Sequence, residues 1–172
     1  MEEKIYDRTA AVRYAREWAL KRNPAYYDFS EIGGDCTNFV SQCIYAGAGV
    51  MNMSKTLGWF YINANDRTAS WTSSQFLGRF LTENKGLGPY AKYVSEKEAE
   101  VGDVIQLLNM EGRPYHSLFI IETKPEILVA AHSIDSLDRR LSTYSAPEKR
   151  FLHILGVRTT KKEDFSASVP KI

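Results

Sequence analysis

The chain has 172 residues, enough for one domain with a sizeable hydrophobic core and too few for two comfortable ones. Its 22 basic and 21 acidic residues are well mixed and give a formal net charge of +1, so we expect neither a nucleic-acid nor a membrane partner. The aromatic residues, 10 Tyr, 8 Phe and 3 Trp, suit a well-filled core and a groove for an extended polar ligand.

The first element is predicted to be a helix over residues 7–22. Asp7 is a good N-cap residue, and Pro24 follows the end of the helix. The apolar residues recur at steps of three and four: Ala11, Tyr14, Ala15, Trp18 and Ala19. We expect the aromatic connector that follows to pack over this helix. In an alternative interpretation, Tyr26 or Tyr27 forms a groove wall or donates a hydrogen bond to an oxyanion.

A glycine turn and the start of a second helix meet at Cys36. Gly33 and Gly34 relax the backbone before Asp35, which is a good N-cap residue. The residues that then recur at helical spacing are Phe39, Val40, Cys43, Ile44 and Gly47. A thiol in the first helical turn faces the positive end of the helix dipole and free N–H groups, which lower its pKa. We therefore interpret Cys36 as a nucleophile; the alternative is a buried structural cysteine.

The second cysteine, Cys43, is not expected to form a disulfide with Cys36. Seven residues along one helix separate them by roughly 10 Å, which is beyond the reach of a disulfide. Cys43 is most simply a small buried hydrophobic residue. A zinc site needs about four clustered ligands, whereas this chain has two cysteines and three scattered histidines. We expect no metal and no other cofactor.

Residues 51–69 have no clean period and are predicted to form an irregular excursion, of the kind that often walls a site. A third helix is expected after it, beginning at Ser70 or Ser73 and ending before Gly86. The candidate substrate-binding residues are Asp35, Tyr27, Trp59 and Trp71.

From Val101 the pattern changes to short apolar runs separated by turns, which is typical of β-strands. The predicted strands are 104–108, 115–121, 126–132 and 151–158. Helices therefore dominate the first half and strands the second, which predicts an α+β domain with the helix of Cys36 packed on a C-terminal antiparallel sheet. We expect one domain over residues 1–158 and a polar, mobile tail over 159–172.

A cysteine nucleophile needs a base, and His116 stands at the start of a predicted strand. If a three- or five-residue turn centred on Lys124 joins this strand to the next, His116 lies opposite His132. His132 would then orient the imidazole of His116 as the third member of a triad. A two-residue turn would place the two histidines on opposite faces, and Asp135 would be the better orienter. Alternatively, both are sheet-surface histidines, and His153 is expected to be structural.

These residues resemble the bacterial putative amidase domain family. The resemblance rests on the run 33–43, and it covers residues 6–158. The other matching segments are Asn23, Tyr26-Tyr27, Trp59, Ser70-Trp71, Gly102-Asp103-Val104-Ile105, His116-Ser117 and Ala131-His132-Ser133-Ile134-Asp135. That family belongs to the papain-like clan, with the NlpC-type and CHAP-type cell-wall hydrolases. The resemblance therefore implies a papain-like fold.

By resemblance, Cys36 is the nucleophile, His116 the base and His132 the best match for the third group. The resemblance also implies that an amide bond in peptidoglycan is hydrolysed through a thioester acyl-enzyme, by an amidase or an endopeptidase. This function suggests the cell wall or the extracellular space, although the chain shows no secretory signal and no wall-binding module. We expect a monomer that acts on peptidoglycan or a peptide amide. The alternatives are a wall-binding module with little turnover and a cysteine acyltransferase.

Overall fold

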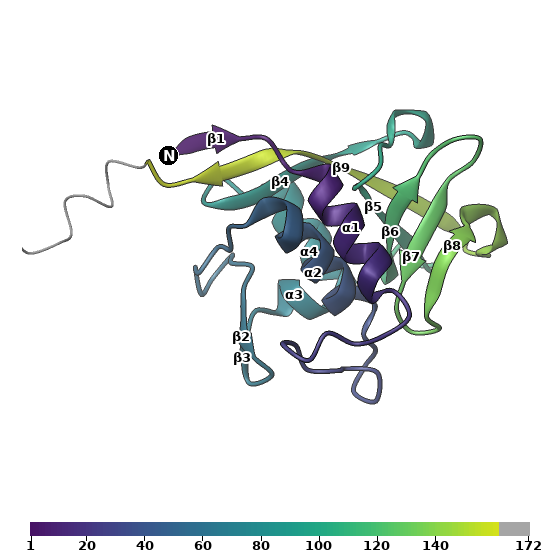
Figure 1. Cartoon of the computed structure of the whole chain (residues 1–172), viewed down its shortest axis with the longest axis horizontal. Coiled ribbons are helices and arrows are strands. Elements are labelled where there is room, and N and C mark those ends of the chain that lie inside the picture. The colour runs from purple at the N-terminus through teal and green to yellow at the C-terminus, as the bar shows by residue number, and fades with distance from the viewer. Residues whose placement is uncertain (162–172) are drawn as a thin grey trace, which may run out of the picture.

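The computed structural model describes residues 1–161, in which helices pack against an antiparallel sheet (Figure 1). The helices are α1 (Arg8–Trp18), α2 (Cys36–Ala48), α3 (Ala69–Thr72) and α4 (Ser74–Glu83), with 3₁₀ turns at Glu96–Glu98 and Leu141–Thr143. The strands are β1 (Glu2–Lys4), β2 (Tyr61–Asn63), β3 (Asp66–Arg67), β4 (Gly88–Val94), β5 (Val104–Leu108), β6 (Pro114–Glu122), β7 (Leu128–Ala131), β8 (Ser136–Arg140) and β9 (Glu148–Thr159). The predicted α+β class is confirmed.

The main sheet has the strand order β1-β9-β5-β6-β7-β8, and β4 also pairs with β9. All of these pairings are antiparallel. The sequence did not predict β1 or β4, because β1 has only three residues, all of them exposed, and β4 begins at Gly88-Pro89, a pair typical of turns. Most of the tail expected from Thr159 lies outside the described residues, and Thr159 itself ends β9.

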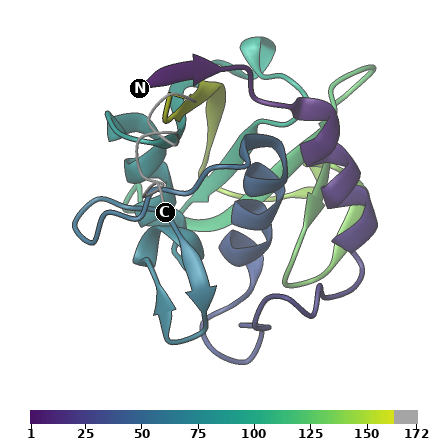
Figure 2. The same cartoon turned by 60° about the vertical axis from the view of Figure 1, so that its left-hand side comes forward.

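Helix α2 is the central helix, since ten of its 13 residues are buried. Figures 1 and 2 show it between α1 on one side and the β2–β3 hairpin on the other. One hydrophobic cluster joins the helices to a face of the sheet and includes Phe39, Phe119 and Ala130. A second cluster, which includes Leu118 and Ile120, covers the other face. The prediction that the helix of Cys36 packs on the sheet is confirmed.

Helix α1 begins where the sequence predicts, because the Asp7 carboxylate accepts a hydrogen bond of 2.9 Å from the backbone N–H of Ala10. It ends at Trp18, short of the predicted Arg22. The side chain of Arg22 instead extends to acidic groups in two loops. No helix within residues 1–161 is long and apolar enough to cross a membrane.

The pairing of β6 with β7 differs from the predicted register by one residue. Phe119 lies opposite Ala130, and Ile120 lies opposite Val129. The connection over residues 123–127 has one of the predicted lengths, but it is centred on Pro125 rather than Lys124. An irregularity between Ile120 and Glu122 then shifts the register again. Because a shift of one residue exchanges the two faces of a strand, the prediction that His116 lies opposite His132 is wrong.

Replacing Gly47 of α2 by alanine should destabilise the protein. A Cβ atom there would lie 2.5 Å from a ring carbon of Tyr6 and 2.6 Å from the backbone oxygen of Asp7. The backbone oxygen cannot move without disturbing the start of α1, so we expect the free energy of unfolding to fall by about 1–3 kcal/mol despite the higher helix propensity of alanine. Urea denaturation measures this loss.

The exposed residue Thr9 in α1 provides the control, because Thr9→Ala should change the free energy of unfolding by less than about 0.5 kcal/mol. A Gly47→Ala variant as stable as the wild type would contradict the close packing of α1 on α2.

Candidate active site

Cys36 is the first residue of α2, and its side chain is partly exposed. The two residues before Asp35 have left-handed backbones, with φ values of 81° at Gly33 and 101° at Gly34. Glycine adopts this conformation at little cost. The glycine turn therefore leads directly into the N-terminal end of a buried helix, where the thiol of Cys36 lies, as the sequence predicts.

The pKa of the Cys36 thiol lies below its ordinary value. Burial raises this pKa, but interactions with His116, with the backbone N–H of Ser117 and with the hydroxyl of Thr37 together outweigh burial. For Cys43, by contrast, burial raises the pKa well above its ordinary value. His116 is therefore the residue that lowers the pKa of Cys36 most, whereas Cys43 is a buried thiol of the core.

Three hydroxyl groups next to the thiol lie within hydrogen-bond distance of one another and so form a ring. The Oγ atoms of Thr37 and Ser74 are 2.9 Å apart, those of Thr37 and Ser117 are 3.0 Å apart, and those of Ser74 and Ser117 are 2.8 Å apart. The ring joins α2, α4 and β6. Thr37 Oγ1 also lies 3.7 Å from Cys36 Sγ, so its proton can point either into the ring or toward the sulfur.

The Asp35 carboxylate is fully buried and accepts three hydrogen bonds. These come from the backbone N–H of Phe29 at 2.9 Å, from Asn38 Nδ2 at 2.9 Å and from His132 Nδ1 at 2.6 Å. Asp35 occupies the N-cap position, but its side chain makes no cap hydrogen bond to the first turn. The prediction that it contacts substrate is also corrected, because its partners enclose it.

His132 does not orient His116. Its Nδ1–H donates to Asp35, while its Nε2 lies 2.9 Å from the backbone oxygen of Trp18. Its ring stacks on Phe39 with the centroids 4.1 Å apart. The register of β6 and β7 explains this correction, because it places His132 beside the start of α2 rather than opposite His116.

Asp135 does not orient His116 either. Its two carboxylate oxygens accept hydrogen bonds of 2.8 and 3.0 Å from Arg22, which also forms ion pairs with Asp28 and Asp35. The aromatic ring nearest to His116 is that of Tyr144, with the centroids 6.2 Å apart. Sequence reasoning missed both Arg22 and Tyr144, since neither lies in a motif that marks its role.

The tryptophans predicted to bind substrate lie in the core. Trp59 and Trp71 are fully buried, with their ring centroids 4.7 Å apart. Tyr26 stacks on Trp71, whose Nε1–H donates to Asn38 Oδ1 in α2. The aromatic groove predicted from these residues is therefore corrected: they support α2 from within. Tyr27 is 46% exposed, so its predicted contact with substrate stays a prediction.

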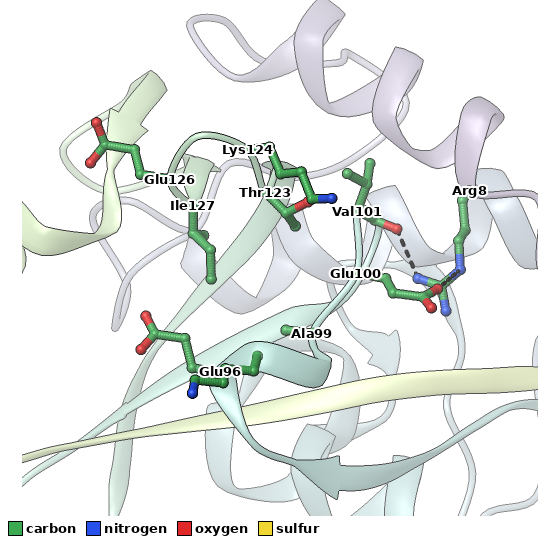
Figure 3. A pocket seen from close by; sticks show the side chains of 10 residues that line it. Arg8, Glu96, Ala99, Glu100, Val101, Thr123, Lys124, Glu126 and Ile127 are labelled. Atoms are coloured by element: carbon green, nitrogen blue, oxygen red, sulfur yellow. Dashed lines mark hydrogen bonds and ion pairs between the residues drawn. The ribbon is translucent and has the colours of Figure 1, made fainter.

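Cys36 lines neither of two cavities in the described part of the chain. One, of about 680 Å³, lies between the Glu96–Glu98 turn and the β6–β7 connection, and Figure 3 shows Glu100 beside Arg8 there. The other, of about 710 Å³, lies between the β2–β3 hairpin and α4. Within residues 1–161, no three His, Cys, Asp or Glu side chains are grouped so that they could hold a metal ion.

Residues 5–155 match the family described as "Putative amidase domain". The chain belongs to this family. The matched region contains Cys36, His116 and the Asp35–His132 pair. Membership in an amidase family indicates a hydrolase that acts on C–N bonds.

The amidase domain is also 34% identical over 167 residues to a Bacillus subtilis (strain 168) protein named "Uncharacterized protein YhbB". This alignment covers 92% of the chain and 52% of that protein, so the chain spans about half the length of its relative. No solved structure matches the chain.

Removing the charge of Asp35 should destabilise the domain. Asp35→Asn leaves His132 without its buried carboxylate partner, so we expect the free energy of unfolding to fall by about 3 kcal/mol or more. Urea denaturation measures the change.

Ser133→Ala is the control for Asp35→Asn, because it removes only the neutral 3.1 Å hydrogen bond from the backbone N–H of Asp35. Its expected cost is about 1 kcal/mol. A loss in Asp35→Asn no larger than in Ser133→Ala would contradict the importance of the buried pair.

Removing the Thr37 hydroxyl should raise the pKa of Cys36. Thr37→Val keeps the shape of the side chain but loses a donor that lowers this pKa. The pH at which the rate of Cys36 alkylation by iodoacetamide reaches half its maximum should therefore move upward. Thr37→Ser, which keeps the hydroxyl, should leave it in place. An unchanged profile in Thr37→Val would show that the hydroxyl does not act on the thiolate.

Proposed function

We propose that this chain is a papain-like cysteine amidase that cleaves an amide bond in peptidoglycan. The observation that carries the proposal is the lowered pKa of the Cys36 thiol. This thiol lies at the start of α2, and its interaction with His116 of β6 lowers the pKa. Membership in an amidase family supports amide hydrolysis. The resemblance to the bacterial putative amidase domain family, with its relation to NlpC-type and CHAP-type hydrolases, implies the papain-like type and the cell-wall substrate.

In the first step, the Cys36 thiolate attacks the carbonyl carbon of the amide. The C–N bond then breaks, and the leaving nitrogen takes a proton from the His116 imidazolium. The products of this step are a free amine and a thioester between the acyl group and Cys36. In this step Cys36 supplies the nucleophile, and His116 supplies the proton.

In the second step, neutral His116 takes a proton from water, and the hydroxide oxygen attacks the thioester carbon. The C–S bond breaks and Cys36 leaves as a thiolate. The acyl group is released as a carboxylic acid, and the thiolate–imidazolium pair is restored.

Backbone N–H groups at the start of α2 can stabilise the oxyanion of both tetrahedral intermediates. The first N–H groups of a helix have no partner within the helix. The N–H of Cys36, the first residue of α2, is one of these groups, and the Asp35 carboxylate, which faces His132, makes no cap hydrogen bond to those that follow it. The N–H of Asp35 itself donates to Ser133 Oγ.

In this proposal His116 is held by its strand and by packing rather than by a third polar residue. Its position on β6 is fixed by pairing with Leu107 of β5. The neighbouring ring of Tyr144 lies under the guanidinium of Arg139, with 3.7 Å between the guanidinium carbon and the ring centroid. The alternatives His132 and Asp135 have partners elsewhere.

Mass spectrometry of purified peptidoglycan after incubation with the protein tests the proposal. The wild type should release fragments with new amine and carboxyl ends, and Cys36→Ala and His116→Ala should reduce their rate of formation by about 10³-fold or more. Cys43→Ala is the matched control, because it removes the buried cysteine and should keep the activity of the folded protein.

Equal fragment yields from the wild type and Cys36→Ala would contradict the proposal. Binding without any cleavage by the wild type would identify a wall-binding module instead. Transfer of the acyl group to a supplied amine in place of water would identify an acyltransferase.

A further inference from the structure

The cavity of about 710 Å³ between the β2–β3 hairpin and α4 has an excess of positive charge. Three basic residues from three different segments line it: Lys55 from the loop before β2, Arg67 from β3 and Arg79 from α4. Asp66 is the one acidic residue among its lining residues. We call this cavity the hairpin cavity.

The cavity shown in Figure 3 provides a comparison. Three basic and three acidic residues line it: Arg8, Lys97, Lys124, Glu96, Glu100 and Glu126. Its Arg8 forms ion pairs with Glu100 at 3.5 Å and with the buried carboxylate of Asp103 at 2.7 Å. The numbers of basic and acidic residues there are equal, so the excess of positive charge distinguishes the hairpin cavity.

Arg67 is held in place without a carboxylate partner within residues 1–161. Its guanidinium lies over the ring of Phe29 at 4.4 Å, its Nε donates to Thr72 Oγ1 at 3.3 Å, and its Nη1 donates to the backbone oxygen of Ala64. These contacts fix the cation but do not neutralise it. A fixed guanidinium is well suited to bind a carboxylate.

The other two cations of the hairpin cavity are also available to a ligand. Lys55 has no ion pair in the described part of the chain, and Arg79 pairs with Glu83 through side chains that are 60% and 53% exposed. Such an exposed pair is weak and can be exchanged for a ligand carboxylate. Phe60 and Phe76 line the same cavity, so an anionic ligand that also has apolar atoms fits it.

Phe29 contacts both the hairpin cavity and the segment that carries Cys36. Its ring packs against the Arg67 guanidinium, and its backbone N–H donates to Asp35, the residue before Cys36.

We propose that the hairpin cavity is a subsite for an acidic peptide portion of the substrate, whose carboxylate binds between Lys55, Arg67 and Arg79. The identification of the ligand as part of the substrate rests on the proposed amidase function. The excess positive charge of the cavity itself does not depend on that function.

Binding of two matched peptides to the Cys36→Ala protein tests the proposal by calorimetry. The probes are N-acetyl-Ala-Glu-amide and N-acetyl-Ala-Gln-amide, which differ only in the charge of one side chain. We expect the Glu peptide to bind about tenfold more tightly than the Gln peptide. Adding Lys55→Gln and Arg79→Gln should reduce this preference, because only Arg67 then remains, whereas Lys97→Gln and Lys124→Gln in the other cavity should leave it unchanged.

Equal affinities for the two peptides would overturn the proposal, as would a preference that Lys55→Gln and Arg79→Gln do not reduce. Because the protein used lacks the thiol, the result is independent of turnover. A charge preference together with an inactive wild type would contradict the amidase function alone. Peptidoglycan cleavage without a charge preference would contradict the subsite alone.

Discussion

The hydrogen bond of 2.6 Å between the buried Asp35 carboxylate and His132 is the contact on which the arrangement of the site depends. Asp35 also accepts hydrogen bonds from the backbone of Phe29 and the amide of Asn38, so one carboxylate joins the segment before the glycine turn, α2 and the end of β7. A buried charge is tolerated only when it is paired and fully hydrogen-bonded. These segments therefore have to take their positions together.

In this arrangement, the residues that hold the start of α2 in place differ from those proposed to carry out the reaction. Asp35 and His132 lie on the helix-packed side of the sheet and fix the start of α2. Cys36 and His116 take no part in that network, and the proposed chemistry depends on them. The backbone N–H of Cys36, the first residue of α2, is available to a developing negative charge, and Asp35 makes no cap hydrogen bond to the groups that follow it. Under the proposed function the two histidines therefore have different tasks, because His132 supports α2 and His116 acts as the base.

The sequence allowed the local features to be predicted and failed where distant segments decide the outcome. Helix α2, the glycine turn and the first-turn position of Cys36 follow from local periodicity and backbone preference. The partner of His132 does not, because a bulge beside Ile120 shifts the strand register by one residue, and nothing in the local pattern indicates a bulge there. Likewise, the burial of Trp59 and Trp71 depends on how an irregular segment folds back over α2.

The pH dependence of Cys36 alkylation, compared between the wild type and His116→Ala, tests the central claim that His116 activates the Cys36 thiol. The account predicts a wild-type inflection below that of an unperturbed cysteine, since the pKa of Cys36 is lowered. The inflection should move upward in His116→Ala, because burial would then act without its main opposing effect. The same inflection in both proteins, or a wild-type inflection at or above the unperturbed value, would contradict the account.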